Sequence, residues 1–72
     1  MTFEQFLDKA DNFYYENEFE LRHGQSIMNV LHLIRKDLYA KIKDTDIDCF
    51  YDDGTVQFTL EYLEKHWTVD FN

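Results

Sequence analysis

The sequence predicts a small all-α domain of three helices, with an acidic, aromatic loop between the second and the third. Three observations favour this class. Apolar residues recur at steps of three and four in three segments, Pro is absent, and only two of the 72 residues are Gly. Because 44% of the residues are apolar and 18% are aromatic, the composition is that of a folded chain, and residues 1–72 are expected to form one domain.

The first helix is expected at about residues 3–17. Thr2 and Gln5 have the spacing of a capping box, in which each side chain bonds to the main chain of the other residue. One apolar stripe follows at helical spacing: Phe3, Phe6, Leu7 and Ala10.

The second helix is expected at about residues 25–43, and Gly24 opens it. Lys41 and Lys43 would lie in its last turn, where the helix dipole favours cations. This segment has the clearest helical periodicity in the chain: Ile27, Val30, Leu31, Ile34, Leu38 and Ile42.

The third segment, residues 55–67, fits two patterns. Alternation over residues 56–62 is typical of a strand, whereas Val56, Leu60 and Leu63 with Trp67 form a helical stripe. A single strand would have nothing obvious to pair with, and no hairpin turn separates it from residues 67–71. We favour a helix; the alternative is an α+β domain with a C-terminal strand or hairpin.

Charge is segregated along the chain. The net charge of −8 divides into −5 over residues 1–21, +4 over residues 22–43 and −7 over residues 44–72. Either the basic middle packs between the acidic flanks, or the acidic surfaces face a basic partner. Direct nucleic-acid binding is not expected, because it needs a basic surface.

The composition also indicates the cellular compartment in which the protein is expected. Residues 2–11 are too charged for a secretory leader, and no stretch approaches the ~20 apolar residues that cross a bilayer. A lone Cys excludes a disulfide framework. We therefore expect a cytoplasmic protein that does not bind membranes.

Metal or cofactor binding is not predicted. The first three ligand positions of a calcium loop are filled by acids, but Cys49 and Thr55 stand where that loop needs Gly and Glu. The three histidines have no ligand spacing. The residues concerned are Asp44, Asp46, Asp48, His23, His32 and His66.

Catalysis is not predicted either. Cys49 with a distant His could form a nucleophile pair, but the neighbouring Asp48 disfavours the thiolate. A chain with two glycines also has few means of building an oxyanion pocket.

An interaction surface is the one site that the sequence favours. Phe50 and Tyr51 are adjacent rings in an acidic loop, so one of them is expected at the surface, and Tyr14 and Tyr15 pose the same choice. Exposed aromatics rimmed by acids are typical of interfaces. The predicted partner-binding residues are Tyr15, Glu18, Asp46, Asp48, Tyr51, Asp52 and Asp53.

Residues 22–67 resemble a family of short, uncharacterised proteins of bacteria and their phages. The shared pattern is Arg-x-Gly-Gln, an Asn four positions after the Gln, Ile-x-x-Thr, Asp-x-Phe-Tyr-x-Asp, and a final helix ending near Trp. Relatives carry Pro at the position of Cys49 and Ser at that of Gly54. The positions that match the pattern include Arg22, Gly24, Gln25, Asn29, Phe50 and Trp67.

The resemblance implies a mostly helical small domain and no chemistry. By position, Gln25 and Asn29 share a helix face, from which they are expected to hold the loop 49–53 by hydrogen bonds, which would make the pattern structural. Phage occurrence favours a protein that binds a host protein.

The sequence thus favours a small acidic protein-interaction module, phage-encoded, that binds and inhibits a host defence protein. A first alternative is a DNA mimic, whose carboxylates imitate phosphates and occupy a nuclease or another DNA-binding protein. A second alternative is a self-associating structural protein, so a homo-oligomer is also considered.

Overall fold

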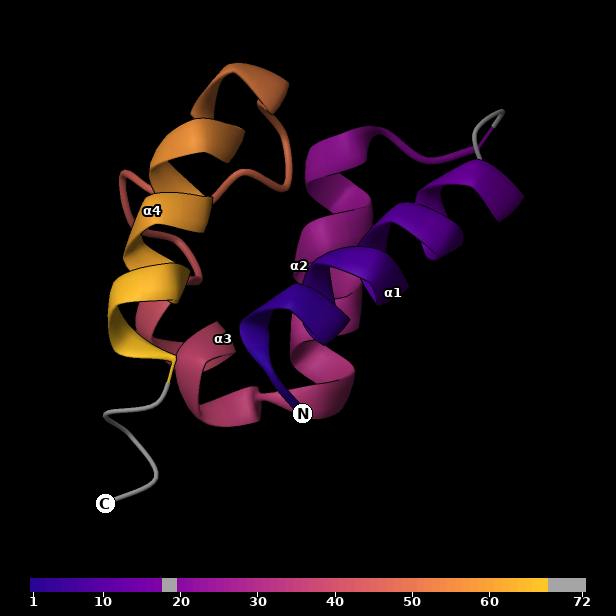
Figure 1. Cartoon of the computed structure of the whole chain (residues 1–72). Coiled ribbons are helices and arrows are strands. Elements are labelled where there is room, and N and C mark those ends of the chain that lie inside the picture. The colour runs from indigo at the N-terminus through magenta and orange to yellow at the C-terminus, as the bar shows by residue number, and fades with distance from the viewer. Residues whose placement is uncertain (18–19, 68–72) are drawn as a thin grey trace.

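The computed structural model describes residues 1–17 and 20–67, and every regular element in that part of the chain is helical (Figure 1). The predicted all-α class is confirmed, and the alternative strand over residues 56–62 is wrong. The suggested pairing strand at residues 67–71 lies almost wholly outside the described residues. The elements are α1 (Phe3–Glu16), α2 (His23–Ile34), α3 (Lys36–Ile42), the 3-10 turn η1 (Asp53–Thr55) and α4 (Val56–His66).

Helix α1 begins at the predicted capping box. The Gln5 amide donates to Thr2 Oγ1 at 3.1 Å, and the Thr2 amide donates to Gln5 Oε1 at 2.8 Å. These bonds satisfy two main-chain donors at the helix start that would otherwise be unpaired. The helix buries Phe6 and Ala10 completely against the rest of the domain.

The segment predicted as one helix over residues 25–43 is two helices. It begins at His23 and is interrupted at Arg35, whose φ of −140° and ψ of 71° are not helical. Neither Pro nor Gly lies there, so the break has a tertiary cause. The Arg35 side chain is only 7% exposed and bonds to the end of α4, while the turn brings Leu38 and Ile42 into the core.

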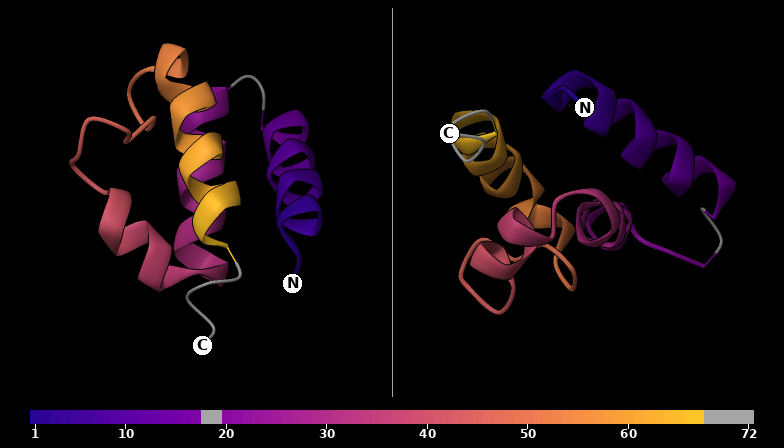
Figure 2. Two further views of the ribbon diagram at one scale, coloured as in Figure 1. Left: turned by 60° about the vertical axis from the view of Figure 1, so that its left-hand side comes forward. Right: turned by 90° about the horizontal axis from the view of Figure 1, so that it is seen from below.

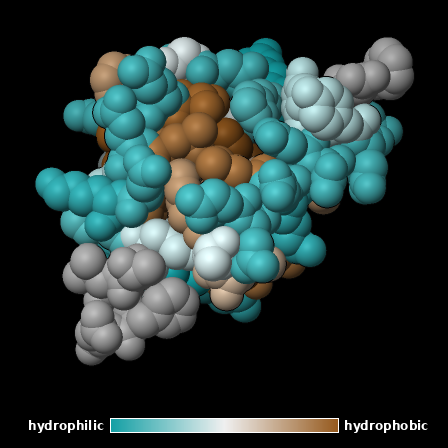
Figure 3. All heavy atoms as spheres, in the orientation of Figure 1, coloured by the Kyte–Doolittle hydropathy of each residue, from teal (hydrophilic) through white to brown (hydrophobic). Residues whose placement is uncertain are grey.

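Helices α1 and α4 stand on the same side of α2 and do not pack closely on each other (Figure 2). In the orientation of Figure 1, apolar side chains remain visible in a hollow of the surface between α1 and α4 (Figure 3). The helices α1 and α4 therefore form two walls of an open face of the domain.

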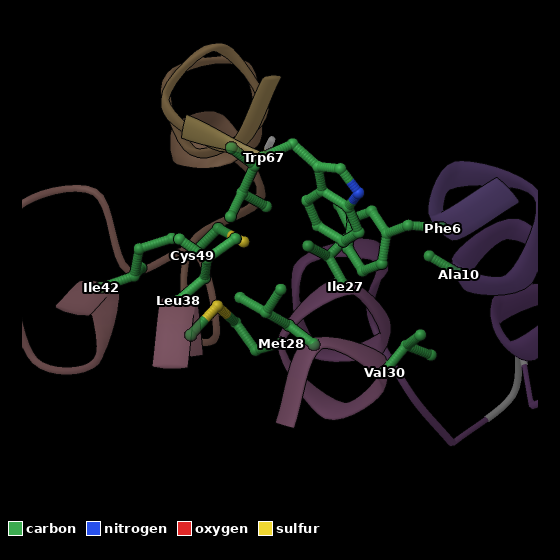
Figure 4. Packing of buried hydrophobic residues seen from close by; sticks show 11 residues of the cluster. Phe6, Ala10, Ile27, Met28, Val30, Leu38, Ile42, Cys49 and Trp67 are labelled. Atoms are coloured by element: carbon green, nitrogen blue, oxygen red, sulfur yellow. The ribbon is translucent and has the colours of Figure 1, made fainter. Parts of the chain in front are cut away.

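The core gathers side chains from all four α-helices and from the loop before η1 (Figure 4). Trp67 reaches from the end of α4 toward α1, where its ring centroid lies 5.0 Å from that of Phe6. The core consists of Phe6, Ala10, Ile27, Met28, Val30, Leu31, Leu38, Ile42, Cys49, Leu63 and Trp67.

Trp67 also links three parts of the chain: Met1, the junction of α2 and α3, and the end of α4. Its Nε1–H donates to the Met1 carbonyl at 2.9 Å, and its own carbonyl accepts from Arg35 Nη1 at 2.8 Å. The Arg35 guanidinium lies 4.9 Å from the centre of the indole ring, within cation–π range. These contacts give Trp67 a structural role.

Among the described residues, no helix has the length and apolar character needed to cross a membrane.

Candidate protein-interaction surface

The acidic loop begins where α3 ends, with a backbone reversal at Asp44. Its φ of 64° places Asp44 in the left-handed region, which is usual for the residue that terminates a helix but is normally filled by Gly. The Asp44 amide donates to Asp48 Oδ2 at 2.8 Å, and the Asp48 amide donates to the Thr45 carbonyl at 3.1 Å. These bonds close residues 44–48 into a compact turn.

Three of the predicted partner-binding carboxylates hold the loop in shape. Asp48 Oδ1 accepts from the Phe50 amide at 2.9 Å, and Asp52 Oδ1 accepts from the Gly54 amide at 2.8 Å. Asp53 Oδ1 accepts from a more distant donor, the Gly24 amide at the start of α2, at 2.9 Å. Each of these acids is thus part of the fold before any partner binds.

Asp46 differs from these three acids. Its side chain is exposed, and its carboxylate accepts no hydrogen bond from the residues that the structure describes. Of the four Asp residues that are predicted to contact a partner, Asp46 is therefore the one whose carboxylate does not help to hold the loop.

The loop is anchored on the first turn of α2. The Cys49 thiol donates to the Gly24 carbonyl at 3.5 Å, and Arg22 Nη1 donates to the Tyr51 carbonyl at 3.3 Å. The expected reach of Gln25 to the loop is not found: its Oε1 accepts from the Arg22 amide at 2.9 Å and caps α2. Asn29 is half-buried on α2, and its side chain makes no hydrogen bond to a described residue.

Cys49 is a packing residue of this anchor. Its side chain is fully buried in the core, and burial raises the pKa of the thiol above its usual value of 9.0. The neutral thiol is therefore favoured at physiological pH, which is the opposite of what a nucleophile needs.

Phe50 and Tyr51 divide as the sequence predicted, one inward and one outward. The Phe50 ring is half-buried against the core, whereas Tyr51 is 79% exposed, and the two rings meet edge to face at 4.7 Å. A hollow of about 150 Å³ lies beside them, lined by Met28, Tyr39, Lys43, Asp44, Asp48, Phe50 and Tyr51.

Tyr14 and Tyr15 divide in the same way on α1. Tyr14 is half-buried, with its ring 5.1 Å from that of His23, whereas Tyr15 is 68% exposed. Tyr15 lies on α1 and Tyr51 lies in the loop, so these two predicted contacts come from different elements. Glu18 lies outside the described residues.

The sequence did not indicate the surface between α1 and α4. A groove of about 420 Å³ lies there, and its apolar wall residues belong to the predicted helical stripes. Half-buried apolar side chains and exposed polar residues both line it: Phe3, Leu7, Val56, Gln57, Leu60, Glu61 and Glu64.

Two ion pairs involve the basic middle segment in the part of the chain that the structure describes. His23 Nε2 lies 3.5 Å from Asp11 Oδ1, and Arg35 Nη2 lies 2.7 Å from Asp37 Oδ2. The second pair is internal to the basic middle segment. Within the same residues, no three His, Cys, Asp or Glu side chains converge to hold a metal ion.

The fold and the surface define the class of the protein as a small acidic all-α domain with an aromatic loop and an apolar groove. Comparison of the chain with models of protein families, with curated proteins and with solved structures finds no match.

Proposed function

We propose that this protein is a small acidic protein-interaction module that binds a basic partner protein. The observation that carries the proposal is the position of Tyr51. Its ring is 79% exposed on a loop that three hydrogen bonds fix to the start of α2, among five Asp side chains of residues 44–53.

A fixed loop makes an exposed aromatic ring effective in binding. The Tyr51 main chain is already held by Arg22, and its ring packs on Phe50, so little conformational entropy is lost when a partner covers it. Tyr is among the residues that contribute most to interfaces, and the surrounding carboxylates favour a partner of positive charge.

The bacterial and phage resemblance directs the search for this partner toward a bacterial host protein, whose activity the module would block. Affinity capture from a host lysate with the immobilised protein, followed by mass spectrometry, would identify it. Inhibition is then measured on the captured protein's own activity.

The decisive comparison uses Tyr51→Ala beside Phe58→Ala. Phe58 is a matched control, because it is a ring that is 57% exposed on α4, outside residues 44–53. We expect Tyr51→Ala to weaken binding of the captured partner by about 2 kcal/mol, roughly 30-fold, and Phe58→Ala to leave it unchanged.

Dependence on salt tests the DNA-mimic alternative with the same variants. A mimic binds through its charges, so its affinity falls steeply as screening increases. Binding that disappears in high salt but tolerates Tyr51→Ala would favour the mimic and contradict the proposal. Equal losses for the two variants would also contradict it.

A further inference from the structure

The groove between α1 and α4 continues toward the N-terminal end of α1. A second hollow of about 410 Å³ adjoins it, because Phe3 and Glu64 line both. Trp67 is among the residues that line this second hollow. We call the two adjoining hollows the trough; Figure 3 shows apolar surface in the hollow between α1 and α4.

The trough is apolar at its centre. Phe3 and Leu7 from α1 face it together with Val56 and Leu60 from α4, and all four side chains are only half-buried. Each pair is spaced four residues apart, so each helix presents one apolar row along the trough. Contiguous apolar surface of this kind on a small domain is typical of a binding site.

The charged side chains that line the trough are all acidic. Glu4 lies on the α1 side, Glu61 and Glu64 lie on the α4 side, and no Lys or Arg is among the described residues that line either hollow. An occupant therefore has to match an apolar strip that carries two carboxylates on its α4 side and a third, Glu4, in the adjoining hollow.

We propose that this trough binds an amphipathic helix of a partner protein whose apolar stripe is bordered by Lys or Arg. The wall formed by the 11 residues of α4 is about 16 Å long, which corresponds to about three turns of a bound helix. Helix α1 already packs on α2, α4 stands on the same side of α2 (Figure 2), and a further helix between α1 and α4 would complete a bundle. This proposal deepens the proposed function by naming the partner's chemistry.

A second copy of this chain is a poor occupant. Each copy carries a net charge of −8, and the acidic border of one trough would have to approach acidic surface of the other. Like charges brought together at an interface are unfavourable. The charge pattern favours a different, cationic chain.

The test uses a synthetic 14-residue peptide of Leu and Lys with the Leu residues at helical spacing. The chain has one Trp, and Trp67 lines the second hollow, so selective excitation of Trp67 reports binding of a Trp-free peptide. We expect saturable binding of this peptide. A peptide with Glu in place of every Lys, and one with the same composition but no apolar stripe, should not bind.

Two matched double variants separate the trough from general attraction to an acidic protein. Glu61→Gln with Glu64→Gln removes two charges from its border, and Glu16→Gln with Glu20→Gln removes two exposed charges elsewhere. The first pair should weaken peptide binding about 5- to 10-fold, and the second less than about 2-fold. All four positions are exposed, so both double variants are expected to fold.

An apolar pair makes the complementary comparison. Leu60→Ser should lower the affinity for the Leu–Lys peptide at least about tenfold, whereas Phe58→Ser, on another face of α4, should not change it. Equal losses within either matched pair would overturn the proposal, as would equal binding of the Glu peptide. Sedimentation velocity that shows a dimer broken by Leu60→Ser would assign the trough to a second copy instead.

The outcomes also separate this inference from the proposed function. Tyr51→Ala should leave peptide binding unchanged, because Tyr51 does not line the trough. A captured partner that needs Tyr51 but is indifferent to Leu60→Ser and to the Glu61–Glu64 variant would overturn the trough proposal and leave the interaction module intact. Binding of the Leu–Lys peptide, with no captured partner whose binding depends on Tyr51, would support the trough proposal and contradict the proposed function.

Discussion

The main chain of Gly24 lies directly against the carbonyl group of Cys49. A Cβ atom at Gly24 would stand 1.9 Å from the Cys49 carbonyl oxygen and 3.1 Å from Asp53 Oδ1. The loop that carries Tyr51 can approach α2 this closely only because residue 24 has no side chain.

Gly24→Ala is therefore expected to lower the free energy of unfolding by about 3 kcal/mol, because main-chain atoms on both sides have to move apart. Urea denaturation followed by Trp67 fluorescence and circular dichroism measures this. Gly54→Ala is the matched control: its nearest neighbour would be the Asp52 carboxylate at 3.0 Å, and an exposed side chain can move. Similar losses for the two variants would contradict the close packing at Gly24.

Asp37 should give the domain a pH-dependent contribution to stability. Arg35 Nε and Nη2 donate to its two oxygens at 3.0 and 2.7 Å, and these bonds lower the pKa of Asp37 from 3.8 to about 2. A lowered pKa means that the contribution is complete above pH 3.8 and is lost as the pH falls toward 2. Because the Asp37 side chain is 47% exposed, screening by solvent keeps the contribution within about 1 kcal/mol.

NMR titration of the Asp37 carboxyl measures this pKa directly, and Asp37→Asn supplies the comparison. The variant should lose less stability than the parent protein between pH 4 and pH 2. An ordinary carboxyl pKa near 3.8 at Asp37 would show that the bidentate pair does not persist in solution.

Asp44 should be a site where Gly is preferred to Ala. Its φ of 64° disfavours a residue with a Cβ atom, and Asp tolerates this region better than Ala does. Asp44→Gly and Asp44→Ala remove the same charge, so the difference between them isolates the backbone effect. We expect the Gly variant to be more stable than the Ala variant by about 1 kcal/mol in thermal or urea unfolding. Equal stabilities would mean that the backbone reversal relaxes.

The Cys49 thiol should react slowly with aromatic disulfides. It is fully buried, and burial also raises its pKa, so both access and thiolate formation are unfavourable in the folded state. We expect the native protein to react at least about 100-fold more slowly than the protein in urea, because the loop has to open first. A native rate close to the unfolded rate would place the thiol at the surface.

Local patterns predicted most of the helical content. The capping box at Thr2 and Gln5 begins α1 as expected, and the stripe ending at Trp67 correctly favoured a helix over a strand. The break at Arg35 was missed because nothing in its immediate sequence disfavours a helix. Its cause is the contact between Arg35 and the distant Trp67 carbonyl, and no local periodicity contains such a contact.

Less of the candidate interaction surface than of the fold could be predicted from the sequence. That one of two adjacent rings should be exposed follows from backbone geometry alone, and Tyr51 is the exposed one. The trough was not predictable, because Leu7 and Leu60 have the same helical spacing as core residues. Whether such a residue is covered depends on the distance between α1 and α4, which tertiary packing sets.

The bond from Trp67 to the Met1 carbonyl spans 66 positions, and it has a consequence for the order of folding events. Helices α1 and α2 are neighbours in sequence and can pair early, whereas docking of the end of α4 against Met1 and Phe6 has to close nearly the whole chain into a loop and carries a larger entropic cost. Contacts of Trp67 are then formed late, after the rate-limiting barrier. Substitutions there should accelerate unfolding and leave the folding rate nearly unchanged.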